Sequence, residues 1–191
     1  MATRRIGESV FDHGAQFISV RSMFFRSLVE QWEDDGLVKQ WCRGFLNADR
    51  QLIQDGYLRF YAAQGMNTLA KDLVQNIDLS LTQNLEVCLQ EKAIQIDLQD
   101  SVWQVQSESG KSYHADALLV TAPLPQALQL LKKAKGYTFE RDILERLEAI
   151  GYDPCIAVMA SLDGPSGLAE PGGLDNKDPM SPIKWIADNR Q

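Results

Sequence analysis

The feature that most restricts the fold is an alternation of apolar and polar residues. Ile94, Ile96 and Leu98 alternate with polar neighbours, and the same pattern returns from Trp103. Because successive side chains of a strand point to opposite faces, a period of two predicts antiparallel strands. The turns are expected at Asp100-Ser101 and Ser109-Gly110, and the last strand at 117–121. The sequence therefore predicts a three-stranded β-meander in an α+β chain.

Helices are predicted before and after the meander. Ser22 can cap a helix over 23–35, where apolar residues recur at helical spacing and Gly36 follows. On this stripe an aromatic side chain such as Trp32 is expected in the core, and a cofactor role for Trp32 or Trp41 is the weaker interpretation. The other helices are expected to begin at Met66 or Asn67, at Pro123–Pro125, and after a cap at Thr138.

Apolar runs without alternation predict further strands. The runs at 85–89 and 155–160 are read as strands, the second of them buried on both faces. Since the first run follows a helix, it also indicates a crossover unit. Residues 37–61 predict short strands joined by turns, because Gly44, Asn47-Ala48-Asp49 and Asp55-Gly56 interrupt the apolar runs. Residues 163–182, rich in Gly, Pro, Asp and Ser, predict a long loop.

Composition indicates a globular chain that does not bind nucleic acid. The 191 residues are 45% hydrophobic, and the formal charge is −7. Phosphate binding needs clustered cations, and the basic cluster at 132–135 lies where a helix should end, so it is interpreted as complementing terminal carbonyls. No apolar run is long enough to cross a bilayer. The three dispersed cysteines predict neither a disulfide framework nor a metal site, which favours a reducing, cytoplasmic compartment.

Several kinds of catalytic chemistry have little support. A serine hydrolase needs a nucleophile beside a base, yet the chain has two histidines and no G-x-S-x-G elbow. His114 is interpreted as an exposed strand residue rather than a base. Closely spaced zinc ligands and a P-loop are also missing from the sequence. No catalytic residue is therefore assigned.

The segment 11–17, Phe-Asp-His-Gly-Ala-Gln-Phe, is the strongest candidate for a ligand contact. Gly14 lacks a Cβ, so the main chain around it can approach a ligand closely, and Gln16 offers both a donor and an acceptor. A large planar or anionic ligand would use such access. The same residues also fit an ordinary bend between a strand and a loop.

Together with other motifs, this segment resembles the renalase-like, FAD-dependent amine oxidases. The further motifs, in that family's order, are Arg4-Arg5, Gly65-Met66-Asn67, 119–126 (Leu-Val-Thr-Ala-Pro-Leu-Pro-Gln), Asp163-Gly164-Pro165-Ser166, and 185–189 (Trp-Ile-Ala-Asp-Asn). The resemblance spans nearly the whole chain. It implies a partial FAD-binding domain containing the meander, at 1–21 and 62–123, and a mixed helix/sheet substrate-binding domain, at 22–61 and 124–191.

The resemblance also assigns site residues. It implies FAD contacts at Gly14, Ala15, Gln16, Val87 and Pro123, where the backbone of Val87 would pair with the adenine. It implies that the small-molecule substrate faces Trp185 and Asn189. The chemistry would be hydride transfer from a small amine or a reduced-nicotinamide-like substrate to the flavin, with dioxygen as the acceptor.

The family's G-x-G-x-x-G turn, which holds the FAD pyrophosphate, is missing from this sequence. The chain is therefore expected to be a fragment that binds FAD weakly or not at all and is inactive alone. Removal of a neighbouring strand–helix unit would uncover a sheet edge, so a homodimer of the fragment is expected. The competing hypothesis is a noncatalytic protein-interaction module.

Overall fold

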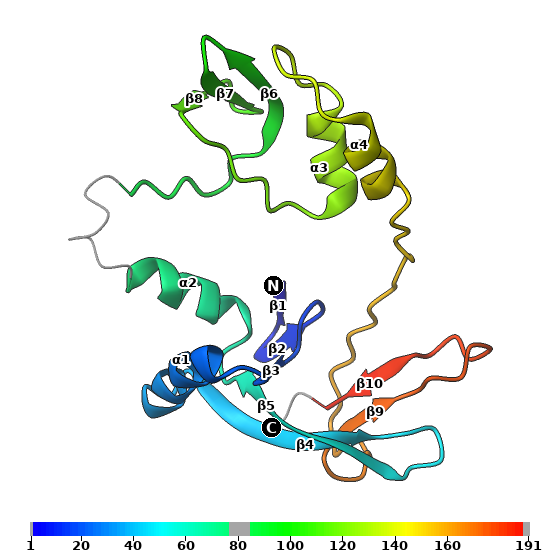
Figure 1. Ribbon diagram of the computed structural model, residues 1–191. Helices are drawn as coiled ribbons and strands as arrows, with labels where there is room; N and C mark the ends of the chain where they lie inside the picture. Colours follow the sequence, from blue (N-terminus) through cyan, green and yellow to red (C-terminus); the bar gives the residue numbers. More distant parts are fainter. Residues whose placement is uncertain (1, 77–84, 189–191) are drawn as a thin grey trace. The chain divides into compact units, whose positions relative to one another are not determined.

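The computed structural model describes residues 2–76 and 85–188, which form helices and strands in two compact units. Unit 1 combines Met1–Gln83 with Ile156–Gln191, so the two ends of the chain meet in one unit. Unit 2 is Asn84–Cys155. Each unit is a part of the chain whose residues contact one another more than they contact the rest. Figure 1 labels the helices and strands of both units. The predicted division into FAD-binding and substrate-binding domains concerns function and stays a prediction.

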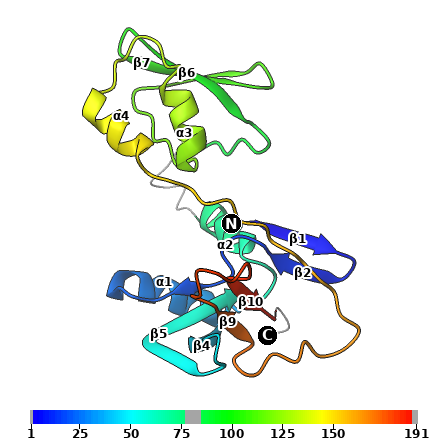
Figure 2. The same cartoon turned by 90° about the vertical axis from the view of Figure 1, so that its right-hand side faces the viewer.

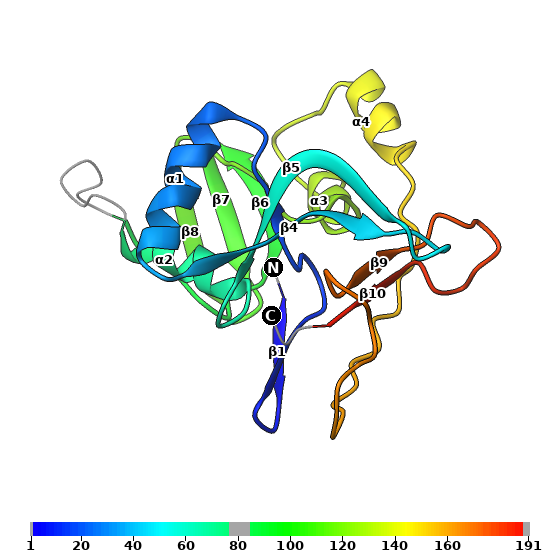
Figure 3. The same ribbon diagram turned by 90° about the horizontal axis from the view of Figure 1, so that it is seen from below.

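The centre of unit 1 is a five-stranded sheet with the order β10-β9-β4-β5-β3. Its strands are β3 (Ile18–Ser19), β4 (Val38–Leu46), β5 (Leu52–Ala62), β9 (Gly173–Asp175) and β10 (Trp185–Ala187). Neighbours are antiparallel except β4 and β9, which pair in parallel through Leu46 and Leu174. Figure 3 shows β9 and β10 side by side next to β4.

Strands β4 and β5 form one long hairpin, so the prediction of several short strands in 37–61 was wrong. The glycines that indicated turns lie inside the strands instead. A Cβ at Gly44 would come within 2.1 Å of the Ile53 carbonyl oxygen, so only glycine lets the partner backbone pass there. Gly56 has φ +81°, a conformation that glycine adopts readily. The turn predicted at Asn47-Ala48-Asp49 is confirmed, and Asn47 Oδ1 accepts a bond from the Gln51 N–H at 2.8 Å.

Helices α1 (Met23–Asp34) and α2 (Asn67–Gln75) accompany this sheet. The predicted cap of α1 is confirmed, because Ser22 Oγ accepts from the Phe25 N–H at 3.2 Å. Trp32 Nε1 donates to Asp72 Oδ2 at 2.8 Å and so joins the two helices. The main core contains Val20, Val29, Trp32, Val38, Phe60, Ala62, Met66 and Leu69. The expectation that Trp32 belongs to the core is thus confirmed.

A hairpin of β1 (Thr3–Ile6) and β2 (Ser9–Asp12) closes the N-terminus of α2. Both carboxylate oxygens of Asp12 lie 3.0 Å from the Met66 N–H. Thr3 Oγ1 accepts from the Asn67 N–H at 3.2 Å and donates to Asp12. The helix predicted at Met66 or Asn67 is therefore capped by side chains more than fifty positions earlier in the chain.

Unit 2 contains the predicted three-stranded antiparallel meander, but its last strand lies at Ser112–Ala115 instead of 117–121. Its strands are β6 (Ala93–Gln99), β7 (Val102–Ser107) and β8 (Ser112–Ala115), in the order β6-β7-β8 with antiparallel pairing. Helices α3 (Leu124–Leu131) and α4 (Arg141–Glu148) follow, and α3 contacts β6 (Figure 2). Asp97 in β6 accepts from the Lys135 N–H at 3.0 Å. Helix α4 begins at Arg141, so the prediction of a cap at Thr138 was wrong.

Three predicted strands, at 85–89, 117–121 and 155–160, are not strands. A continuous apolar run forms a buried strand only when neighbouring strands pair with it, and no described strand does so here. Their side chains remain accessible: Leu119 is 86% exposed and Ile156 is 90% exposed. The predicted loop at 163–182 contains the short strand β9, which pairs with β4 and β10.

The described part of the chain has no helix that is long and apolar enough to cross a membrane. The same residues contain no group of three or more His, Cys, Asp or Glu side chains that could hold a metal ion. Cys42, Cys88 and Cys155 are free thiols.

Candidate functional site

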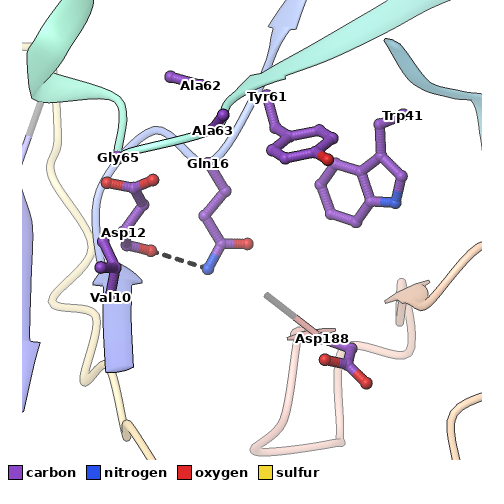
Figure 4. Close-up of a pocket in the computed structure, with 9 residues that line it drawn as sticks. All are labelled: Val10, Asp12, Gln16, Trp41, Tyr61, Ala62, Ala63, Gly65 and Asp188. Atoms are coloured by element: carbon purple, nitrogen blue, oxygen red, sulfur yellow. Dashed lines mark hydrogen bonds between the residues drawn. The ribbon is translucent and has the colours of Figure 1, made fainter. Parts of the chain in front are cut away.

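A recess in unit 1 brings together residues from both ends of the chain (Figure 4). Asp12 and Gln16 come from β2 and the segment after it, Trp41 and Tyr61 come from β4 and β5, and Asp188 follows β10. The recess is open to solvent, and its cavity volume is about 50 Å³. Pockets for small molecules typically span about 300–1,000 Å³. The recess therefore has room for one edge or group of a ligand and not for a whole ligand.

The amide of Gln16 is fixed at this recess by two hydrogen bonds. Its Nε2 donates to the main-chain oxygen of Asp12 at 2.9 Å, and its Oε1 accepts from Trp185 Nε1 (Figure 4 shows the first bond). An amide nitrogen carries two hydrogens, so one Nε2–H of Gln16 is left without an acceptor among the described residues. Gln16 and Trp185, both assigned to the site from the sequence, are brought together although 169 positions separate them.

An aromatic cluster, made of Phe17, Trp41, Phe45, Tyr61 and Trp185, packs beside the recess. The closest ring centroids are those of Phe45 and Trp185, at 4.6 Å, and of Phe17 and Phe45, at 5.0 Å. Trp41 lies edge-on to Phe45 at 5.1 Å, and its Nε1 donates to the Pro171 carbonyl at 2.7 Å. Such edge and tilted pairs are favourable ring geometries. These ring contacts and the Trp41 hydrogen bond pack β4 against Pro171 and Trp185.

Trp41 and Tyr61 were not assigned to the site from the sequence. Both line the recess, but they lie on neighbouring strands whose register is visible only in the structure, where Tyr61 pairs with Lys39. Burial raises the pKa of the Tyr61 hydroxyl, so this group stays protonated and able to donate a hydrogen bond at neutral pH. The sequence offered a cofactor role for Trp41 only as the weaker interpretation, and it gave no signal for Tyr61.

The carboxylate of Asp12 is already committed to the fold. It accepts from the Met66 N–H through both oxygens and from Thr3 Oγ1. A helix N-terminus attracts anions, but here a carboxylate of the chain itself occupies the start of α2. This end of the recess therefore does not provide a phosphate site.

The remaining residues that were predicted to contact FAD or the substrate are not brought together at the recess among the described residues. Gly14 and Ala15 form the bend between β2 and β3, and Gly14 does not have the positive φ that would demand glycine. A Cβ at Gly14 would meet Ala2 N at 3.5 Å, an ordinary contact. Val87 and Pro123 belong to unit 2. Asn189 lies outside the described residues.

Comparisons with known proteins agree with the resemblance in the sequence. Residues 9–185 match the family model described as flavin containing amine oxidoreductase. Renalase of Mus musculus is 28% identical over 99 residues, which is 52% of this chain and 27% of renalase. The match thus covers about a quarter of that relative's length. Because the family match covers nearly the whole chain, this protein belongs to the flavin-containing amine oxidoreductases.

Proposed function

We propose that this chain supplies the ligand recess of an FAD-dependent oxidoreductase. The reaction is hydride transfer from a small amine or a reduced-nicotinamide-like substrate to the flavin, with dioxygen as the final acceptor. Membership of a flavin-containing family supports the general class. The observation that carries the proposal is the hydrogen bond between Gln16, which lines the recess, and Trp185, because this bond joins motifs from opposite ends of the sequence.

The residues of the recess suit contact with one edge or face of a flavin rather than enclosure of its whole ring system. An isoalloxazine has two flat apolar faces and an edge of nitrogen and oxygen atoms. The recess offers flat side chains in Trp41 and Tyr61 and one unused N–H of Gln16. The fit does not extend to the pyrophosphate, since Asp12 occupies the start of α2. When bound, a flavin supplies the two-electron acceptor that side chains lack.

The chain's own residues bind and orient in this proposal. Gln16 holds its amide toward the ligand because Asp12 and Trp185 fix both of its ends. The aromatic cluster excludes water from one side, which strengthens polar contacts in the recess. Trp185, with Asn189, faces the substrate. Gly14 and Ala15 approach the flavin in unit 1, whereas the FAD contacts of Val87 and Pro123 stay predictions from the sequence.

The test is a glycine substitution in the full-length protein. We expect Gly14→Val to abolish flavin retention, because a branched side chain would occupy the space where the main chain approaches the ring. The fold should persist, since a Cβ at this position meets only ordinary contacts. Flavin absorbance of the purified protein measures retention, and far-ultraviolet circular dichroism measures the fold. Gly151→Val is the control, because its Cβ would point into open space.

If the Gly14→Val protein keeps its flavin, the assignment of segment 11–17 to the cofactor site is wrong. The alternative, a noncatalytic interaction module that self-associates, is favoured by the exposure of Leu119 and Ile156. The two functions separate in the unmutated full-length protein. A yellow protein supports the oxidoreductase, whereas a colourless protein that binds no added FAD supports the module. The chain alone is expected to be colourless and to leave FAD fluorescence unchanged at micromolar concentration.

A further inference from the structure

Arg59 is a buried charge in strand β5 whose two terminal nitrogens both have partners. The residue is 8% exposed. Its Nη1 and Nη2 donate to the two oxygens of Asp55 at 3.0 and 2.7 Å, and Nη1 also donates to the Tyr57 carbonyl at 3.2 Å. This bidentate pair fixes the plane of the guanidinium. Its Nε is buried with no partner among the described residues, so the arrangement is not optimised for hydrogen bonding alone.

The guanidinium of Arg59 lies over two rings of the aromatic cluster. Its Cζ is 4.8 Å from the ring centroid of Phe45 and 5.7 Å from that of Phe17. Both distances fall inside the roughly 6 Å range of cation–π attraction. A fixed cation over two ring faces favours one orientation of each ring.

Phe45 and Phe17 transmit this orientation toward the recess. The ring of Trp185 lies 4.6 Å from Phe45 and 6.0 Å from Phe17, between centroids. The same indole donates its Nε1–H to Gln16, which lines the recess. Arg59 is thus connected to the Gln16 amide through one layer of rings, although it does not line the recess itself.

We propose that Arg59, held by Asp55, is a positioning residue that orients Phe17 and Phe45 and thereby sets the Trp185–Gln16 hydrogen bond. An apolar side chain in its place would fill the same space without favouring any ring orientation. This role concerns the chain's own side chains and does not depend on which ligand enters the recess. Its test is therefore independent of the flavin proposal.

The four tryptophans provide the readout. Trp41 and Trp185 belong to the aromatic cluster, whereas Trp32 packs against Phe25 and Trp103 against Tyr137. Each indole N–H gives one peak in a ¹H–¹⁵N correlation spectrum, which single Trp→Phe variants assign. We expect Arg59→Met to shift the peaks of the two cluster tryptophans and the side-chain NH₂ peaks of Gln16. The peaks of Trp32 and Trp103 should stay in place.

The matched control is Arg43→Met, because Arg43 is an exposed arginine of the same hairpin that donates to the Gly56 carbonyl at 3.2 Å. Arg59→Lys should give an intermediate shift, since lysine keeps the charge but not the bidentate geometry. Asp55→Asn should shift the same peaks as Arg59→Met. If Arg59→Met does not fold, Arg59→Lys and Asp55→Asn provide the test. Cluster peaks that move no more than in Arg43→Met, or four indole peaks that move together, would overturn the proposal.

Discussion

The two units of the chain bury their apolar residues to very different extents. In unit 1 the core joins helices α1 and α2 to the hairpin β4–β5, and its members come from well-separated segments. Among the described residues of unit 2, only Ile96 and Ala127 are buried apolar side chains. Unit 2 relies instead on strand pairing and on polar contacts such as the one between Asp97 and Lys135.

This contrast indicates where the stability of the chain resides. Burial of apolar area is the dominant favourable contribution to folding, so unit 1 should be the more resistant unit. The ligand recess lies in that unit. A site that has to hold side chains such as Gln16 and Trp185 in one geometry benefits from such a scaffold.

The largest effect is expected from a truncation in the core of unit 1. Met66 is fully buried, and a buried Met→Ala change costs about 2–5 kcal/mol. Met66→Ala should lower the free energy of unfolding of unit 1 by that amount. Urea titration followed by the indole peaks separates the units, since Trp32 reports on unit 1 and Trp103 on unit 2. An equal shift of both midpoints would contradict the division. Ile96→Ala is the mirror variant and should move the Trp103 midpoint alone.

A smaller effect is expected at the cap of α2. Asp12→Ala removes the acceptor of the Met66 N–H, and loss of a helix cap costs about 0.5–2 kcal/mol. The variant should lower the urea midpoint reported by Trp32. Asp12→Asn keeps a side-chain oxygen and should retain most of the stability. If both variants behave like the unmutated chain, the hairpin β1–β2 does not cap α2 in solution.

The smallest effect is expected at a polar cluster of unit 2. Lys111 Nζ lies 2.8 Å from Glu91 Oε1 and Ser109 Oγ donates to Glu91 Oε2 at 2.6 Å. The bond from Lys111, followed by those from the serines, lowers the pKa of Glu91 from 4.5 to about 2. A lowered carboxyl pKa stabilises the fold above the unfolded value, so this contribution should be lost as pH falls from 4.5 toward 2.

The measurement for this cluster is the urea midpoint of Trp103 across that pH range. Glu91→Gln should flatten the decline, because glutamine does not titrate. Lys92→Gln is the control, since the pair of Lys92 with Glu108 joins two exposed side chains. If the urea midpoint falls as steeply with pH in Glu91→Gln as in the unmutated chain, other carboxyl groups cause the loss of stability.

Local signals in the sequence predicted much of the fold. The meander follows from alternation around Ile96, and the start of α1 follows from the cap at Ser22. The strands expected at 85–89, 117–121 and 155–160 failed because apolar runs specify burial but not the neighbours that provide it. The composition of these three runs does not reveal whether another strand lies beside them, and no described strand does.

The candidate site was predictable only where a motif marked it. Gln16 and Trp185 were assigned through motifs, and the structure joins them. Trp41 was only the weaker interpretation and Tyr61 was missed, because the register of a hairpin with internal glycines cannot be read from spacing. Arg59 was missed because a charged residue in a strand is ordinarily exposed, whereas here the ion pair with Asp55 and the rings of the aromatic cluster cover it.

The bond between Gln16 and Trp185 also sets the order in which the molecule can mature. These partners are 169 positions apart, with all of unit 2 between them in the sequence. At synthesis rates of about 5–20 residues per second, Gln16 waits on the order of 10–30 s for its partner to leave the ribosome. During that interval Phe17, Trp41 and Phe45 lack Trp185. We therefore expect the nascent chain to expose these aromatic side chains to solvent and to chaperones until β10 has been synthesised.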